Sequence, residues 1–200
     1  MKRVFYSFLL VLIAFVFTNC EQGVSNTVPN AAPVNLAGFT TTKIAGGAGQ
    51  KAVKKGPDGK ILEEGTLING AKNGAWISYY PDKDKAIKTM ANYVNNELNG
   101  IFLTFSDRGQ IETLTTYANG IYDGNFAKFR FGNLEESATY VNGQLEGLYK
   151  KFYKTRKIQM EAEYKNGVQD GFYKYYDEDG NVVMEYQYKN GEKVAGGMKK

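Results

Sequence analysis

The side chains that most often carry catalysis and bind metals are scarce in this chain. It has no histidine, which removes the commonest general base and the commonest transition-metal ligand. Its single cysteine is Cys20, so neither a cysteine-based zinc site nor an internal disulfide is expected. Neither a Gly-x-Ser-x-Gly motif nor a Walker-type glycine loop occurs. The chain is therefore predicted not to be an enzyme, and to use no cofactor and no metal.

Two acidic groups come nearest to a chemical motif. The stretch Asp177-Glu178-Asp179-Gly180-Asn181 resembles the start of a calcium loop, but an EF-hand needs Gly at the sixth and Glu at the twelfth position. Val182 and Tyr188 stand there, so an ordinary hairpin turn is expected. Glu135 and Glu136 are adjacent, and on a strand they would point to opposite faces, which disfavours shared acid–base work.

A basic cluster interleaved with aromatic rings is a candidate binding patch. It consists of Lys150, Lys151, Lys154, Arg156 and Lys157 beside Tyr149, Phe152 and Tyr153. Such a patch could hold an anionic glycan, a phospholipid head group or nucleic acid. The alternative is a solvated hairpin tip balanced by Glu161 and Glu163. The formal net charge is +4, and without Lys2 and Arg3, which lie in the expected signal peptide, 23 basic residues face 21 acidic ones, or +2. So small a net charge gives no reason to expect nucleic acid as the partner.

Cys20 follows an export-type segment. Lys2 and Arg3 precede an apolar run from Val4 to Phe17, which is too short for a permanent helical span of about 20 residues. A lone cysteine after such a run resembles the lipobox of bacterial lipoproteins. The resemblance implies a signal peptide at residues 1–19 and lipid attachment at Cys20, hence an exported chain anchored in the envelope of a diderm bacterium. A plain signal peptide with an incidental cysteine, or an uncleaved anchor, is the alternative.

The next segment has the composition of a tether. Residues 21–57 contain three of the four prolines, many small residues and few large apolar ones. Runs such as Ala45-Gly46-Gly47-Ala48-Gly49 bury too little surface to offset the entropy of ordering. Residues 20–57 are therefore predicted to be a lipidated cysteine and a flexible tether, with a typical reach of roughly 35 Å.

The remainder is a tandem repeat, predicted to span residues 58–195 before a short basic tail at 196–200. The phrase Asn-Gly-x-x-x-Gly recurs with its Asn at positions 69, 95, 119, 142 and 166, and in the copy at 95 a second Asn replaces the first Gly. A final Asn-Gly stands at 190. The Asn positions are 26, 24, 23, 24 and 24 residues apart. Asn-Gly supplies the positive φ angles of tight hairpin turns. The spacing predicts an all-β, elongated antiparallel meander of ten to eleven strands, roughly 50 Å long at about 4.8 Å per strand.

Aromatic columns run through the repeats. Counted from the glycine that ends each phrase, the second position is Trp76, Phe102, Phe126, Tyr149 and Tyr173, and the fifth is Tyr79, Phe105, Phe129, Phe152 and Tyr176. The first column is a candidate binding surface together with Lys150, Lys151 and Lys154. Either both faces of the sheet carry aromatics, or a bulge brings the two columns to one face. Small residues at 91, 115, 138 and 162 leave room for neighbouring rings.

The unit from Tyr164 to Asn181 resembles the MORN repeat variant family, and the resemblance extends over about residues 59–194. Some relatives in that family carry an antitoxin label. The resemblance implies tandem β-hairpins, and an array of such repeats favours an extended, non-catalytic binding surface. Three functions remain open: a protein- or envelope-binding scaffold, an antitoxin- or immunity-type protein that masks a toxin, and binding of an anionic lipid or glycan through the basic repeat.

Overall fold

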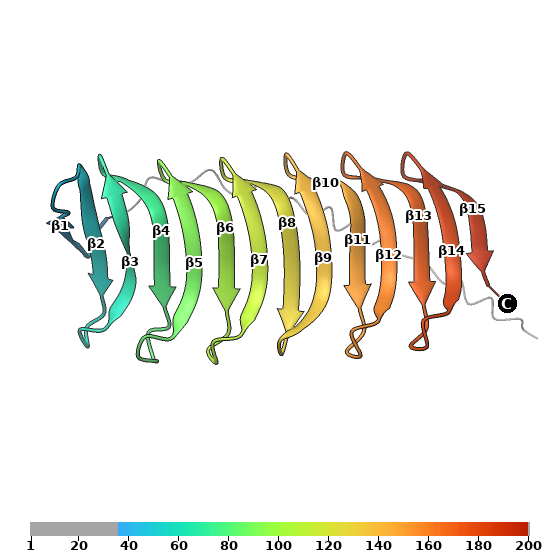
Figure 1. Ribbon diagram of the computed structural model, residues 1–200, viewed down its shortest axis with the longest axis horizontal. Coiled ribbons are helices and arrows are strands. Elements are labelled where there is room, and N and C mark those ends of the chain that lie inside the picture. Colours follow the sequence, from blue (N-terminus) through green and yellow to red (C-terminus); the bar gives the residue numbers. More distant parts are fainter. Residues whose placement is uncertain (1–35, 200) are drawn as a thin grey trace, which may run out of the picture.

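A computed structural model describes residues 36–199, and within them all regular secondary structure is β (Figure 1). Fifteen strands form one antiparallel sheet in which each strand pairs with the next in sequence, except that both the two-residue β10 and β11 pair with β9. The strands are β1 (Phe39–Lys43), β2 (Gly49–Lys55), β3 (Ile61–Ile68), β4 (Ala71–Tyr79), β5 (Ile87–Val94), β6 (Glu97–Phe105), β7 (Ile111–Ala118), β8 (Ile121–Arg130), β9 (Asn133–Val141), β10 (Gln144–Leu145), β11 (Gly147–Phe152), β12 (Ile158–Lys165), β13 (Val168–Tyr176), β14 (Val182–Lys189) and β15 (Glu192–Met198). The predicted meander is confirmed.

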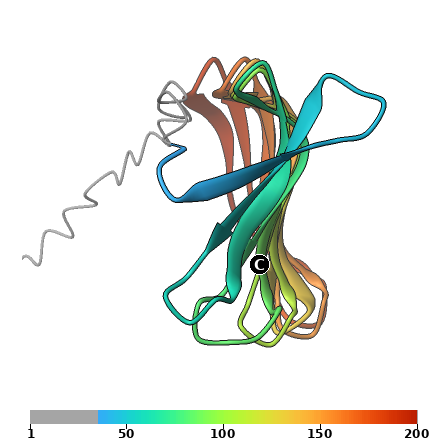
Figure 2. The same cartoon turned by 90° about the vertical axis from the view of Figure 1, so that its left-hand side faces the viewer.

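The start of the array was predicted wrongly. β1 and β2 lie inside the segment interpreted as a flexible tether, and they pair with each other and with β3. Phe39 and Leu36 pack against Trp76. Seen from the N-terminal end, the sheet is bowed and β1 crosses steeply over the strands behind it (Figure 2). The predicted basic tail is also largely strand, because β15 extends to Met198. These additions raise the strand count above ten to eleven.

The predicted signal peptide (1–19) and Cys20 lie outside the described residues. Between 36 and 199 there is no helix long and apolar enough to cross a membrane.

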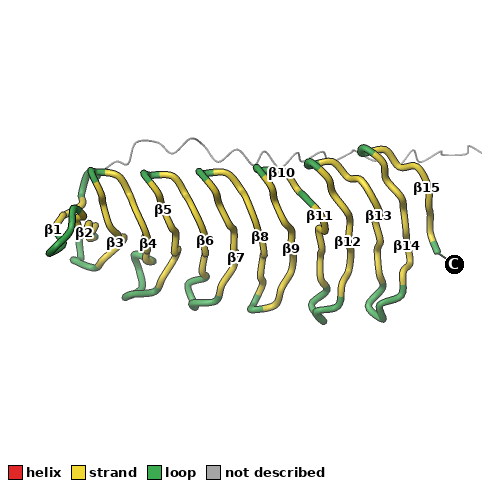
Figure 3. Tube along the Cα trace, turned by 45° about the horizontal axis from the view of Figure 1, so that its top comes forward, coloured by secondary structure: helices red, strands yellow, loops and turns green. Residues whose placement is uncertain are grey.

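At one end of the strands, tight turns follow one another in a row along the sheet (Figure 3). We call this side of the sheet the Asn-turn edge. The six leading Asn residues all have φ between 49° and 52°, and the residue after each has φ between 74° and 83°. Two successive positive φ angles define the type I′ turn, which matches the twist of the flanking strands. Asn tolerates this conformation and Gly adopts it without strain, which explains the repeated Asn-Gly.

Each turn is also hydrogen-bonded to the turn before it. The amides of Asn96, Gly120, Gly143, Gly167 and Gly191 donate to carbonyls of the preceding repeat at 2.7–3.0 Å. Side chains add further bonds: Asn73, Glu146 and Asp170 accept from the backbone amides of Asn95, Asn166 and Asn190. The residue before each phrase-ending glycine therefore caps the following turn in three repeats.

The core is a row across the middle of the sheet in which small and aromatic residues alternate. Gly65 and Ala91 lie opposite Trp76, Thr115 lies between Phe102 and Phe126, and Ala138 lies opposite Phe126. Ala91, Thr115, Ala138 and Ala162 are all buried, at 1–6% exposed. Trp76, Phe102 and Phe126 each lie between two small residues, one on each neighbouring strand, which leaves room for the rings to lean across the row.

The two aromatic columns lie on opposite faces, which answers the question that the spacing left open. Lys72 donates to Glu63 and lies over the Trp76 ring, so these residues share the face that we call the buried face. Tyr79 instead donates to Glu64, and Tyr176 donates to Glu161, on the second face. The extra residue of each bulge lies on the strand that pairs with the fifth-position aromatic. The bulge therefore does not change the face to which that aromatic points.

Candidate binding surface

Rings on the buried face form edge-to-face pairs along much of its length. Tyr117 and Tyr122 are 4.9 Å apart between centroids, Tyr122 and Tyr140 are 5.3 Å apart, and Phe102 and Tyr117 are 6.1 Å apart. Perpendicular rings at these distances gain roughly 0.5–1.5 kcal/mol per pair beyond their buried area. This column therefore stabilises the fold.

That role removes part of the predicted binding surface. Trp76 is only 2% exposed, so it offers a partner almost no contact area, and its expected place on a binding surface is wrong. Its indole nitrogen donates to the carbonyl of Thr66 at 3.1 Å. The other four members of the column, Phe102, Phe126, Tyr149 and Tyr173, are half-buried on the same face.

The basic repeat is divided between the two faces. Lys150 pairs with Glu161 at 3.9 Å on the second face. Lys151 lies 5.9 Å from the Tyr149 ring on the buried face. Lys154 is exposed on the turn between β11 and β12, at the end of the strands away from the Asn-led turns. The three lysines therefore do not form one basic patch.

On the second face, two tyrosine hydroxyls donate hydrogen bonds to carboxylates of the neighbouring strand, and the pKa values of both tyrosines are raised. Burial, and then the hydrogen bond to Glu64, raises the pKa of Tyr79 to about 12. Burial and the bond to Glu161 do the same for Tyr176, whose pKa is also about 12. On the buried face, burial followed by the Glu136 hydrogen bond raises the pKa of Tyr149.

These shifts predict alkaline unfolding. A tyrosine with a raised pKa in the folded state stabilises the fold fully below its unfolded pKa of about 10 and loses that contribution as the pH rises through the folded value. Stability should fall between about pH 10 and 12, with tyrosinate absorbance rising together with loss of strand circular dichroism. Tyrosinate signal that rises fully near pH 10 while the sheet stays folded would contradict this.

The second face exposes an aliphatic band near the Asn-turn edge. Ile101 is 48% exposed and Val94 is 49% exposed. The other members, 41–46% exposed, are Ile68, Ile121, Val141, Leu148 and Val168. Five of the seven, namely Val94, Ile101, Ile121, Val141 and Leu148, are each next in sequence to a ring of the buried face and so point to the second face. Ile68 follows the buried Leu67, and Val168 pairs with Lys165, the residue after the buried-face Tyr164. Because the sheet is a single layer in the described chain, nothing there covers the band.

The most exposed aromatic lies at the other edge, on the turn between β8 and β9. Phe131 is 79% exposed and has a φ of 51°, with Gly132 at 75°. These are the angles of the Asn-Gly turns, but a phenylalanine occupies the position of the asparagine. The left-handed conformation costs a non-glycine residue roughly 1–2 kcal/mol, so a bulky residue there is unusual.

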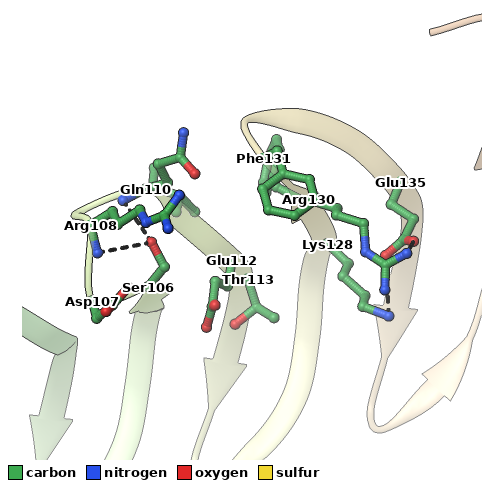
Figure 4. A pocket seen from close by; sticks show the side chains of 12 residues that line it. Ser106, Asp107, Arg108, Gln110, Glu112, Thr113, Lys128, Arg130, Phe131 and Glu135 are labelled. Atoms are coloured by element: carbon green, nitrogen blue, oxygen red, sulfur yellow. Dashed lines mark hydrogen bonds and ion pairs between the residues drawn. The ribbon is translucent and has the colours of Figure 1, made fainter. Parts of the chain in front are cut away.

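This turn is shorter than its neighbours, which leaves space on both sides of it. Arg130 pairs directly with Asn133 across the turn, whereas the turns at 106–110 and 153–157 close over five residues. A pocket of about 530 Å³ separates the Phe131 turn from the Ser106–Gln110 turn (Figure 4). A second pocket of about 210 Å³ lies on the other side, against Phe152, Tyr153 and Lys154.

Charges of both signs surround the ring. Glu135 pairs with Lys128 at 3.3 Å and with Arg130 at 3.7 Å. Lys83 forms an ion pair with Asp107, and this contact lowers the pKa of the Asp107 carboxyl group. Figure 4 shows Arg108 on the facing turn, across the pocket from Phe131. We call Phe131 with Arg108, Arg130 and Lys154 the tip cluster. Phe131 was not singled out from the sequence; the signal present was a large apolar residue directly before a turn glycine, where the corresponding turns have Asp58, Arg108 and Asp179.

The Phe131 conformation predicts a gain in stability on substitution. Phe131→Asn should raise the free energy of unfolding by about 1 kcal/mol, because asparagine tolerates the left-handed conformation. Phe131→Ala is the matched control, since it removes the ring and keeps the strain. Denaturant unfolding of the three proteins measures the effect. An Asn variant no more stable than the Ala variant would contradict the strain.

The fold defines a repeat protein built from tandem β-hairpins, and the comparisons agree with that class. The family described as MORN repeat variant matches residues 145–166 and 169–190, the two adjacent repeats over β10 to β14. No curated protein matches the chain. Solved structures similar to it include the crystal structure of TarM, with 13% identity and a TM-score of 0.33 over 49% of this chain. The similarity covers 20% of that chain and carries no argument about function.

Proposed function

We propose that this chain is an exported, lipid-anchored protein whose repeat array is a non-catalytic scaffold that binds another protein of the cell envelope. The observation that carries the proposal is the exposed aliphatic band on the second face. Contiguous exposed apolar groups on a folded protein usually mark a contact surface. A long, uncovered sheet presents such a surface as one rigid element.

The whole array from 59 to 194 is proposed to consist of MORN-variant repeats. The similarity of residues 145–166 and 169–190 to that family supports this, as do the six turns with one geometry. Binding of anionic lipid or glycan through the basic repeat is less well supported, because Lys150 and Lys151 lie on opposite faces.

The anchor is tested by the mass of the mature N-terminus. The full chain expressed in a diderm bacterium should begin at Cys20 and carry acyl chains, and a Cys20→Ser variant should leave the membrane fraction. An intact Met1, or an unmodified Cys20 on the mature protein, would refute the anchor.

The scaffold is tested by placing a charge on the band. Ile101→Glu and Leu148→Glu should abolish chemical cross-links between the lipoprotein and its envelope partner while leaving the circular dichroism spectrum intact. Val194→Glu is the matched control, because Val194 is 60% exposed on β15 and belongs neither to the band nor to the pockets beside Phe131. A single stoichiometric toxin among the cross-linked proteins would instead favour the immunity alternative. Cross-links unaffected by all three substitutions would refute the band as the contact surface.

A further inference from the structure

The turn at Phe131 needs a left-handed backbone conformation, but it does not need a phenylalanine. The six Asn-led turns show that asparagine serves the same backbone angles, and asparagine would leave no exposed ring. Strain of this kind persists where a side chain is used for something other than folding. The exposed Phe131 side chain in this turn therefore indicates a function, and that function uses the ring.

The surroundings of Phe131 suit insertion into a partner. The short turn leaves a pocket on each side, so the ring stands between two recesses of about 530 and 210 Å³. Each recess is large enough to accept side chains of another chain. An exposed aromatic flanked by arginines is the usual composition of an energetic centre in a protein interface.

The charges indicate the chemistry of the occupant. Arg108 and Lys154 line the pockets and, within the described chain, neither forms a side-chain ion pair, so both can receive carboxylates. Arginine binds carboxylates through two parallel hydrogen bonds. Asp107, Glu112 and Glu135 line the larger pocket as well. A polyanion such as nucleic acid or an acidic membrane would meet these three carboxylates, whereas a protein segment can offer groups of both signs.

We propose that the tip cluster is a docking site for a protein segment that carries acidic residues next to a large apolar side chain. The apolar side chain contacts the Phe131 ring, and the acidic residues pair with Arg108 and Lys154. The inference rests on the proposed binding function and names a site on the edge of the sheet distinct from the aliphatic band of the second face.

The test selects peptides on the purified full-length chain in detergent. A phage-displayed library of random peptides is panned on the wild-type protein, and enriched sequences are synthesised with a fluorophore. We expect an aromatic or large aliphatic residue beside acidic residues. Anisotropy titrations should show about tenfold weaker binding to Phe131→Asn and to Phe131→Ala alike. Arg108→Ala should weaken the same peptides and reduce their salt dependence.

Three results would overturn the inference. One is that no peptide is enriched, and another is that enriched peptides bind the Phe131 variants as tightly as the wild type. The third is that heparin or anionic vesicles, used as separate probes, bind through Phe131 while the peptides do not. Peptides that bind elsewhere on the array would leave the scaffold proposal standing while this inference fails, so the two are separable. The two Phe131 variants exclude unfolding as a cause, because asparagine is expected to stabilise the turn.

Discussion

Gly65→Ala is expected to destabilise the protein by about 3 kcal/mol, because its methyl group would occupy the position of the Trp76 ring. A Cβ on Gly65 would lie 2.2 Å from the nearest ring atom of Trp76, and three ring atoms fall within 2.5 Å. Gly65 does not have a positive φ, so backbone strain plays no part. The tryptophan must move away from Ala52 and Leu67, with which it forms the N-terminal core cluster.

The mechanism of this loss can be isolated by a double-mutant cycle. Trp76→Ala alone should cost about 3–5 kcal/mol, and adding Gly65→Ala to it should cost little more, because the clash is already gone. Gly197→Ala is the control, since a Cβ there meets nothing within 4 Å. Trp76 is the sole tryptophan, so its fluorescence reports unfolding directly. Additive effects of the two substitutions would show that Gly65 does not act through the ring.

Gly124→Ala is the second large effect, and it tests the glycine that ends each repeated phrase. Gly124 has a φ of 111°, a conformation that side-chain-bearing residues rarely adopt, and its Cβ would lie 3.0 Å from the Cβ of Thr116. We expect a loss of about 3 kcal/mol. Because Gly124 lies in the middle of the array, the loss should be local to β7, β8 and β9.

Hydrogen exchange measured by mass spectrometry tests the position of this loss. Peptides from β7 to β9 should exchange faster in Gly124→Ala, while those from β14 and β15 should change little. Gly109→Asn is the control, because Gly109 also has a positive φ, of 77°, but its Cβ meets nothing within 4 Å. Its stability should stay within about 0.5 kcal/mol of the wild type. Uniform acceleration along the whole chain would contradict a repeat-wise fold.

The regular features of the fold could be predicted from the sequence. Asn-Gly pairs at a fixed spacing identified the turns, and the aromatic columns identified the strands between them. The face of each column could not be predicted, because it depends on whether the extra residue of a bulge lies on the column's own strand or on its partner; at Phe105 it lies on the partner, β7. Spacing along one strand contains no information about an extra residue in its neighbour.

The missed features lack the repeated phrase. β1 and β2 have no Asn-Gly turn between them and are rich in threonine and lysine, and the turn that joins them is Gly-rich, so their composition resembles a linker. A signal was nonetheless present, because Gly59 stands at the same place in its turn as Gly109, and the two turns close with the same backbone bond. The caps from Glu146 and Asp170 were missed as well, although the residue before each phrase-ending glycine is always Asn, Asp or Glu.

The candidate site was less predictable than the fold. The aromatic column chosen from the sequence takes part in packing along the buried face, and only its first member, Trp76, is fully buried. Phe131 departs from the pattern, and that departure is visible only when its φ and exposure are known. In a repeat array, the residue that breaks the pattern is the better candidate for function.

The most direct test of the account is photo-cross-linking from position 131 in living cells. A benzoylphenylalanine replaces Phe131 in the lipid-anchored chain, and in a parallel strain it replaces Val194, which is 60% exposed on β15. We expect a single protein adduct of defined mass from position 131 and none from position 194. No adduct from position 131, or the same adducts from both positions, would contradict a docking site at the tip.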